Sequence, residues 1–486
     1  MHELSASNNI FDKFRRTFIG DRAFYKSVLA LVVPIIVQNT ISNVVNLLDN
    51  VMVGQVGTVQ MSGVAIVNQL MFVFMLTIFG GLGGAGIFGA QYYGAGDNEG
   101  LRHTVRFKLL TAAVILAAAI VIFITKGDAL INLYLKGEGD PADAAAMLEH
   151  GSAYLKVMLW GLLPFVVSQV YGGTLRETGE TILPMKASVA AILTNLCLNY
   201  VLIFGKLGFP ELGVEGAAIA TVISRFVEMV IIVVYTHRNT RRFQFVVGLY
   251  RSMRIPAHLV QSIFKKGIPL LVNELFWSLS VSTLTQIFST YGLNVVAGMN
   301  ISSTIGNLFN VVFISMGTAV AVMVGQALGA GDMERAKGYA WKLVFFSVCT
   351  CFVIGTAMAL AAPVIPRIYN TTEEVRGLAT HFMLIGAALM PFFAISHCSY
   401  FTLRSGGKTF ITFLFDSVFS WVVFIPLAYI ITNYTSLDIY MAYPICYLPD
   451  VVKSAIGLIF VKTGYWAQNM VADKAGAASS GVEAAS

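Results

Sequence analysis

Gln91-Tyr-Tyr-Gly-Ala-Gly-Asp-Asn-Glu99 decides the fold of this chain, because it returns as Gln326-Ala-Leu-Gly-Ala-Gly-Asp-Met-Glu334 at an offset of 235 residues. A second block, Thr174-Leu-Arg-Glu-Thr-Gly-Glu-Thr181, returns as Thr402-Leu-Arg-Ser-Gly-Gly-Lys-Thr409 at an offset of 228. Matches that extend along two halves of one chain indicate duplication of a whole structural unit. Repeated membrane bundles with a solute site between them are typical of secondary transporters.

Composition places both halves in a membrane. Of the 486 residues 56% are hydrophobic and 12% are charged, and that charged share is about half of the share in soluble domains. Apolar runs near the roughly 20 residues needed to cross a bilayer recur twelve times, six in each half. Because lipid offers the backbone no hydrogen-bond partner, we predict an all-α integral membrane protein with twelve transmembrane helices. The predicted spans are residues 28–53, 63–92, 107–125, 152–175, 183–204, 214–235, 268–290, 295–326, 340–362, 378–403, 410–431 and 440–461.

Charge predicts the orientation of the helices. Most of the 32 Lys and Arg residues fall before the first span and in alternate loops, and loops of this kind are cytoplasmic. We therefore expect a multi-pass protein of the plasma (cytoplasmic, or cell inner) membrane with both termini in the cytoplasm. This asymmetry explains the net charge of +6, so it predicts neither a nucleic-acid site nor an obligate protein partner. One loop on the opposite side, residues 127–150, carries the acids Asp128, Glu138, Asp140, Asp143 and Glu149.

The predicted domains follow from the spans and from the longest polar connection. They are a cytoplasmic segment 1–25, a six-helix lobe 26–236, a basic linker 237–266, a second lobe 267–462 and a disordered tail 463–486. The linker contains Phe243, Phe245, Leu249 and Tyr250. These residues fit a short amphipathic segment on the inner leaflet, and a solvated linker is an equal alternative.

Several motifs are better explained by structure than by chemistry. Gly81-Leu-Gly-Gly-Ala-Gly86 matches a dinucleotide fingerprint but lies inside a span, where close helix packing explains it. The glycines of the two Gly-Ala-Gly-Asp loops, residues 94–97 and 329–332, fit helix caps, and the Asp that ends each loop fits the start of the next helix. All five cysteines lie in apolar spans, so neither a disulfide frame nor a metal cluster is predicted. With no ATPase motif, nucleophile cluster or cofactor site, the sequence favours a protein that uses an ion gradient over an enzyme.

Asp49 is the clearest charge inside an apolar span, and such charges are usually functional. At 1.5 Å per residue it lies roughly 6 Å below the outer end of the first span, with Asn199, Thr221 and Asn195 at roughly 9, 12 and 15 Å in the fifth and sixth spans. Asn195 and Asn199 are four residues apart, on one helix face. Carboxylate, amide and hydroxyl oxygens suit Na⁺, and an Asp in apolar surroundings can equally bind a proton. The alternative for the Asn and Thr residues is hydrogen bonding between helices.

The second half has no equivalent of Asp49, since the offset carries it onto Leu284. Glu274 lies roughly 11 Å and His397 roughly 9 Å above the inner end of their spans, so the two could share a proton or attract a cation. His397 could instead be a hydrogen-bonded packing residue. We predict structural pairs between Arg225 and Glu228 and between Asp450 and Lys453.

Two prolines occupy matching places in the two halves. Pro34 and Pro269 lie in the first span of each, where a missing N–H permits a kink that is either a hinge or static. The candidate residues of a substrate cavity are polar, aromatic or flexible side chains on the helices near these sites: Gln38, Phe276, Trp277 and Met299.

The chain resembles the multidrug and toxic compound extrusion (MATE) family over about residues 25–462. The resemblance rests on Leu48-Asp-Asn-Val-Met-Val-Gly54, the two Gln-x-x-Gly-Ala-Gly-Asp loops, Leu175-Arg-Glu-Thr-Gly-Glu-Thr181 and Gly213-Val-Glu-Gly-Ala-Ala-Ile-Ala-Thr221. It implies two six-helix lobes related by a pseudo-twofold along the membrane normal. It also implies export of small organic cations by alternating access in exchange for Na⁺ or H⁺, with no other cofactor.

The resemblance also assigns residues. Asp49 corresponds to the family's first-helix cation carboxylate, Asn195 to its fifth-helix Asn and Thr221 to its sixth-helix Thr. Asn199 departs from the Asp that many members carry, and Glu274 follows Pro269 by five residues where related branches leave eight. The alternative function is flipping of a lipid-linked or oligosaccharide substrate on the same helical plan, which would favour a cavity lined by cations.

Overall fold

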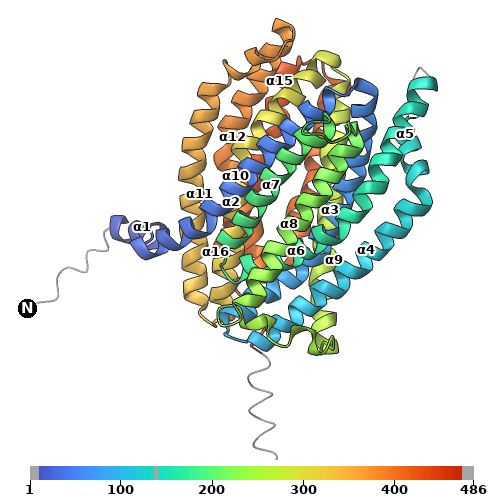
Figure 1. Ribbon diagram of the computed structural model, residues 1–486. Helices are drawn as coiled ribbons and strands as arrows, with labels where there is room; N and C mark the ends of the chain where they lie inside the picture. The colour runs from blue at the N-terminus through green and yellow to red at the C-terminus, as the bar shows by residue number, and fades with distance from the viewer. Residues whose placement is uncertain (1–9, 136–140, 473–486) are drawn as a thin grey trace, which may run out of the picture. The chain divides into compact units, whose positions relative to one another are not determined.

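The computed structural model describes residues 10–135 and 141–472. Throughout these residues the regular secondary structure is helical, and twelve helices are long and apolar enough to cross a membrane (Figure 1). The predicted all-helical membrane fold is confirmed. The described residues form two compact units.

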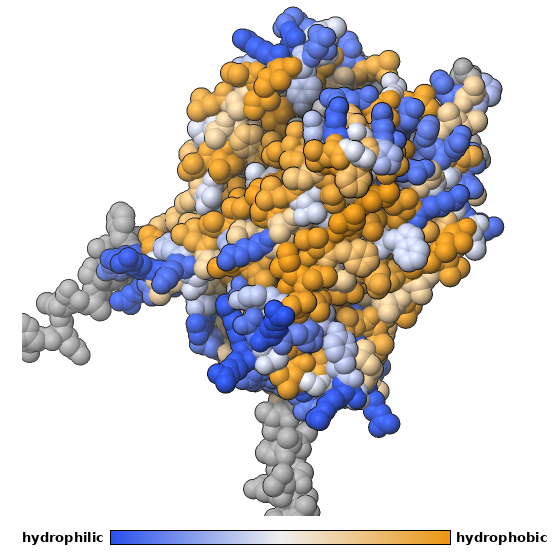
Figure 2. Space-filling model, viewed as in Figure 1, coloured by the Kyte–Doolittle hydropathy of each residue, from blue (hydrophilic) through white to orange (hydrophobic). Residues whose placement is uncertain are grey.

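The N-terminal unit comprises residues 37–89 and 97–271. Within it α8 packs against α5, α6 and α7, while α4 packs against α5 and α6. Figure 2 shows hydrophobic residues over the middle of α7 and α8, as expected for helices in lipid. The unit contains the later part of α2 (Arg22–Gly54), most of α3 (Thr58–Gly94), α4 (Asn98–Leu135), α5 (Pro141–Met158), η1 (Leu159–Gly161), α6 (Leu162–Glu177), α7 (Ile182–Ile203), α8 (Gly213–Arg238), η2 (Gln244–Val246), η3 (Leu249–Arg251) and the start of α9 (Ala257–Ser289).

The C-terminal unit comprises residues 1–36, 90–96 and 272–486, as far as they are described. Helix α12 lies at its centre and packs against α10, α11 and α16. The unit contains α1 (Ile10–Phe18), the start of α2, the end of α3, the later part of α9, α10 (Leu293–Gly329), α11 (Met333–Ala361), η4 (Ile365–Ile368), α12 (Glu373–Ser405), α13 (Thr409–Phe413), the π-helical segments η5 (Leu414–Val418) and η6 (Ser420–Phe424), α14 (Ile425–Tyr434), α15 (Ile439–Tyr447) and α16 (Pro449–Thr463).

Two helices pass from one compact unit to the other. The division falls after Ile36 in α2 and after Leu271 in α9, two residues beyond Pro34 and Pro269 respectively. Both helices continue through their proline. The predicted spans 28–53 and 268–290 each lay within one predicted lobe, whereas the division between the compact units crosses both α2 and α9.

The glycine-rich motifs have the predicted structural roles. Gly84 of α3 lies so close to α9 that a Cβ there would stand 2.5 Å from the Cα of Gly267, which confirms the close-packing interpretation. Gly96 and Gly331 adopt φ of 74° and 80°, the left-handed conformation that glycine favours after a helix. Asp97 accepts a hydrogen bond from the Gly100 amide (2.8 Å), and Asp332 accepts one from the Arg335 amide (3.0 Å), so both cap the next helix.

The linker between the two halves folds onto the helix ends of the N-terminal unit. Phe243, Phe245 and Leu249 are buried, and Arg106 of α4 donates to the carbonyl oxygens of Leu249 (2.9 Å) and Gly248 (2.8 Å). Both predictions for the linker are therefore wrong for these three side chains, which lie in protein instead of lipid or water, whereas Tyr250 is 59% exposed. The physical reason is that an apolar side chain gains similar free energy in either environment.

The predicted tail begins inside an ordered segment. Residues 464–472 follow α16, and the Trp466 side chain is fully buried, with its indole N–H donating to the Val461 carbonyl (3.1 Å). Gln91 accepts from the Met470 amide (2.8 Å) and donates to the carbonyl oxygens of Ser405 (2.9 Å) and Gln468 (3.2 Å). Disorder as predicted from residue 463 is therefore wrong up to residue 472, and residues 473–486 lie outside the described part.

Candidate functional site

Asp49 and Asn199 meet in the N-terminal unit. The Asn199 amide on α7 donates to Asp49 Oδ1 on α2 (2.7 Å) and to Asn195 Oδ1 one turn earlier (3.2 Å). Asn199 is only 1% exposed, and Asp49 is partly buried. These hydrogen bonds join three of the four polar residues that were predicted at one depth, although Asp49 and Asn199 are 150 residues apart in sequence.

Asn195 connects Asp49 to Thr221. One end of its amide lies 3.1 Å from both Asp49 oxygens, and the other end lies 3.3 Å from Thr221 Oγ1 on α8. Turning the amide by 180° exchanges donor and acceptor. With its nitrogen toward Asp49, Asn195 donates to an ionised carboxylate, whereas with its oxygen toward Asp49 the contact needs a shared proton or a cation. The cluster can therefore respond to what is bound at the carboxylate.

A close approach of α7 and α8 brings these side chains together. A Cβ at Gly216, in the first turn of α8, would stand 2.7 Å from the backbone of Leu202 at the end of α7. Only glycine permits this separation, so the Gly213-Val-Glu-Gly216 stretch lets α8 run against the helix that carries Asn195 and Asn199. Thr221 lies five residues after Gly216, and its hydroxyl donates to the Ala217 carbonyl (2.9 Å).

The cluster has the chemistry of a cation site. Among the described residues Asp49 takes part in no ion pair within 4.0 Å, so its charge is not neutralised by a fixed base. The Oδ1 atom of buried Asn199 accepts no hydrogen bond from the side chains and backbone that the structure describes. Asp49, Asn199 Oδ1 and Thr221 Oγ1 thus supply the oxygen donors that a hard monovalent cation prefers, and the carboxylate alone suffices for a proton.

Glu274 and His397 are not joined in the C-terminal unit. Neither a hydrogen bond nor an ion pair connects them in the described structure. The His397 ring lies between Phe313 and Phe401, with centroid distances of 5.3 and 4.9 Å, and its buried Nε2 atom has no hydrogen-bond partner within the described part of the chain. Glu274 on α9 is partly buried, and its charge interacts with those of Arg404 and Asp416.

Asp416 is a partly buried acid that is absent from the predicted site residues. It lies in η5, and its Oδ1 accepts from Lys453 (2.7 Å) while its Oδ2 accepts from Asn273 (3.1 Å). The predicted pairing of Lys453 with Asp450 is therefore wrong, because Asp416 from a different helix supplies the closer carboxylate. Its signal was present in the sequence as an unpaired charge within the predicted span 410–431.

The cavity candidates differ in their surroundings. Gln38 accepts from Arg176 in the N-terminal unit (3.5 Å). Phe276 and Trp277 are 42% and 43% exposed, which leaves them accessible, whereas Met299 packs against the core around Phe288 and Val295. Arg225 donates to the Gly161 carbonyl (3.3 Å) and lies over the Phe165 ring, and no ion pair within 4.0 Å joins it to Glu228 among the described side chains.

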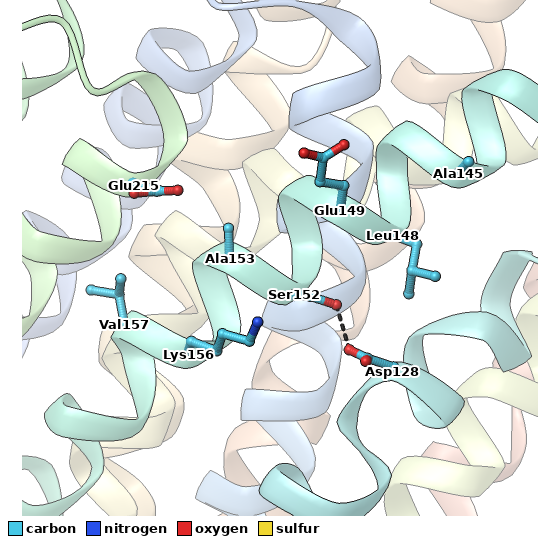
Figure 3. A pocket seen from close by; sticks show the side chains of 9 residues that line it. All are labelled: Asp128, Ala145, Leu148, Glu149, Ser152, Ala153, Lys156, Val157 and Glu215. Atoms are coloured by element: carbon cyan, nitrogen blue, oxygen red, sulfur yellow. Dashed lines mark hydrogen bonds between the residues drawn. The ribbon is translucent and has the colours of Figure 1, made fainter.

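A groove of about 600 Å³ lies on the N-terminal unit, away from this cluster. Figure 3 shows its charged residues on three helices, with Ser152 of α5 donating to Asp128 of α4 (2.5 Å). Glu149, Lys156 and Glu215 complete the charged lining. Asp128 and Glu149 belong to the loop predicted on the outer side, and Glu138 and Asp140 of that loop lie outside the described residues.

Comparison with known proteins gives one consistent family. The sequence profile of the MatE family matches residues 34–201 and 269–430. The chain is 26% identical over 447 residues to the probable multidrug resistance protein NorM of Thermotoga maritima, covering 92% of this chain and 94% of that protein. It is 25% identical over 407 residues to the multidrug resistance protein MdtK of Pectobacterium atrosepticum, covering 84% and 87%. A structure described as the outward-facing conformation of a multidrug resistance MATE family transporter of the MOP superfamily has a TM-score of 0.81 at 21% identity, covering 91% of this chain and 96% of that one.

Proposed function

Since the chain belongs to the MatE family of membrane transporters, which are not enzymes, we propose that it exports small organic cations in exchange for Na⁺ or H⁺. The orientation with both termini in the cytoplasm belongs to the same proposal. Relatives named as multidrug resistance proteins support a small-molecule cargo.

The observation that carries the proposal is a carboxylate without a fixed counterion. Asp49 is partly buried among neutral amide and hydroxyl groups, and no base within the described residues neutralises it by an ion pair. Leaving a buried charge unpaired is costly. A free-energy gain therefore favours binding of a mobile cation, which is the property that an ion-coupled transporter needs.

The hydrogen bonds of the cluster suggest how the two cations exclude each other. When Asp49 is free, Asn199 donates to it at 2.7 Å. A proton on the carboxylate would let Asp49 donate to Asn195, and Na⁺ would instead draw the unpaired Oδ1 of Asn199 toward itself. Either event removes the negative charge that attracts an organic cation, so ion binding weakens cargo binding and the coupling is reciprocal.

Transport by reconstituted protein tests the proposal. Vesicles that contain a fluorescent organic cation receive a Na⁺ gradient or a pH gradient separately, and we expect one of the two to drive its movement. In Asp49→Asn, which keeps the shape and removes the charge, we expect transport under either gradient to fall to the level of empty vesicles. The matched control is Asp128→Asn, an exposed acid of the surface groove, which should transport like the wild type.

Wild-type transport by a folded Asp49→Asn protein would contradict the proposed coupling. Its unfolding temperature, measured in the same detergent, distinguishes lost coupling from lost structure. The alternative of a lipid-linked or oligosaccharide flippase predicts that neither gradient moves an organic cation and that a labelled lipid-linked sugar changes leaflet instead. Arg176 and Arg225, both partly buried in the N-terminal unit, are the cations that such an anionic substrate could use.

A further inference from the structure

The C-terminal unit contains a buried ion pair on an unusual backbone. Asp416 lies in η5, a π-helical segment over Leu414–Val418, and a second π-helical segment covers Ser420–Phe424. Such segments are rare and are frequent at functional sites. Ser417 holds this backbone against α9, because its hydroxyl donates to Asn273 and lies 2.9 Å from its carbonyl oxygen and 2.7 Å from its Oδ1.

The Asp416 carboxylate accepts hydrogen bonds from two side chains, one long and flexible and one short and buried. Lys453 of α16 donates to Oδ1 at 2.7 Å through a flexible side chain, and Asn273 of α9, which is only 2% exposed, donates to Oδ2 at 3.1 Å. The Lys453 and Asp416 side chains are 10% and 20% exposed. The pair is thus largely withdrawn from solvent, where loss of one partner leaves a costly charge on the other.

A second carboxylate can accept Lys453. Asp450 lies one turn before Lys453 on α16, is 8% exposed, and its charge interacts with those of both Lys453 and Asp416. Lys453 therefore bonds to Asp416 and has a second carboxylate one turn away on its own helix. The charged and titratable groups within electrostatic range of Asp416 come from α9, α12 and α16, and they are Glu274, His397, Tyr400, Asp450 and Lys453. Arg404 of α12 lies within the same range of Glu274.

Counting these charges leaves one acid in excess. The acids are Asp416, Asp450 and Glu274 and the bases are Lys453 and Arg404, so the carboxylates outnumber the ammonium and guanidinium groups by one. A cluster of this kind becomes neutral when it takes up one monovalent cation. Both Asp416 oxygens already have a donor, Lys453 at 2.7 Å and Asn273 at 3.1 Å, so binding of a proton requires less rearrangement there than binding of a metal ion, which would have to displace both donors.

We propose that Asp416 is a second proton-binding site of this transporter, in which Lys453 is a tethered counterion that the proton displaces. A proton from water forms an O–H bond with the Asp416 carboxylate and neutralises it. Lys453 keeps its own proton, leaves Asp416 and pairs with Asp450 on its own helix, and deprotonation reverses both changes. This inference rests on the proposed transport function and adds to it a step in the C-terminal unit that moves α16 side chains relative to η5.

Infrared difference spectroscopy of protein in lipid tests the site directly. The measurement uses Asp49→Asn as background, so that the first site is silent, and compares spectra at high and low pH. We expect a carbonyl band from a protonated carboxyl group that is lost when Asp416→Asn is added and kept when the exposed Glu374→Gln is added. With Asp450→Asn the band should appear only at lower pH, because Lys453 then has no second carboxylate to join.

A double variant that removes both charges of the pair controls for misfolding of Asp416→Asn, which leaves Lys453 without its partner. Asp416→Asn with Lys453→Gln removes both charges together, so we expect an unfolding temperature close to that of the wild type. In a protein that retains Asp49, this double variant should move fewer protons for each organic cation transported. An unchanged band in Asp416→Asn, or wild-type proton movement in the double variant, overturns the inference. If Asp49→Asn abolishes transport but one of these two results is found for Asp416, only the second site is overturned. If Asp49→Asn transports like the wild type, the proposed function itself is overturned.

Discussion

The Asn199 side chain allows the two coupling ions to be distinguished. Its amide donates to Asp49 at 2.7 Å, and among the described groups none donates to its oxygen, which in the proposed site would be a ligand of Na⁺. A hydrogen bond to a charged group contributes about 1.5–3 kcal/mol. In Asn199→Ala the ionised carboxylate loses this contribution, so a proton should bind about ten- to a hundredfold more tightly.

Transport assays of Asn199→Ala measure the consequence. If the ion is a proton, the pH profile of transport shifts to higher pH by about one to two units. If the ion is Na⁺, the loss of a ligand instead raises the Na⁺ concentration needed for half-maximal transport. Asn433→Ala, which removes an exposed amide bonded only to its own helix, is the matched control and should leave both curves unchanged. Curves for Asn199→Ala that match this control would exclude Asn199 from the ion site.

Residue positions along single helices were predictable, but contacts between helices were only partly so. The rise per residue gave Asp49, Asn195, Asn199 and Thr221 a common depth, and the structure joins all four. For Lys453 the nearest acid in sequence was Asp450, whereas the partner in space is Asp416. Asp416 lies in a π-helical segment. Such segments do not follow the regular period of 3.6 residues, so the helix face on which Asp416 lies could not be predicted from its spacing.

At the scale of elements, the ends of α3 and α10 contact each other reciprocally. A Cβ at Gly94 would overlap the carbonyl oxygen of Gln326, and a Cβ at Gly329 would overlap that of Gln91. These are equivalent positions of the two repeats, so the contact has local twofold symmetry. The repeated Gln-x-x-Gly motif that revealed the duplication therefore also forms a contact between its two copies.

Gly329→Ala tests the closeness of this contact. Because the added methyl group meets backbone and not a flexible side chain, we expect a loss of about 1–3 kcal/mol of stability. Gly338→Ala in α11, where no atom lies within 4 Å of the new Cβ, is the matched control and should stabilise the protein by up to about 1 kcal/mol. Thermal unfolding in detergent measures both. Equal unfolding temperatures for the two variants would show that the loop contact yields without cost.

Pro34 is suited to a hinge because α2 leaves one compact unit two residues later. Proline in a helix interior destabilises it by about 3 kcal/mol relative to Ala. Pro34→Ala should therefore raise the unfolding temperature and slow transport, since the helix bends less easily. Pro391→Ala is the control, because Pro391 also lies inside a helix but α12 belongs wholly to the C-terminal unit. A static kink would predict the same transport rate for both variants.

At the scale of the whole molecule, sequence could not separate protein interior from lipid. Phe243, Phe245 and Leu249 of the linker and Trp466 after the last span are compatible with either environment, and the structure buries them in protein. The number of membrane-spanning helices could be predicted from hydropathy, because hydropathy depends on local composition. The docking of residues 243–249 and 464–472 depends on hydrogen bonds to Arg106 and Gln91, which lie more than a hundred residues away.

Residues 464–472 tie the two repeats together through their equivalent loops. Gln91 of the first repeat holds Gln468 and Met470, and Asn469 donates to the Gly329 carbonyl of the second (3.2 Å). Removing residues 464–486 deletes these bonds and the buried Trp466, and Trp466→Ala alone should lower stability by about 3–5 kcal/mol. Removing only residues 473–486 is the control, because it leaves Trp466 and all of these hydrogen bonds in place. If both truncations unfold at one temperature, the segment does not stabilise the fold, and the loops of α3 and α10 hold the repeats together unaided.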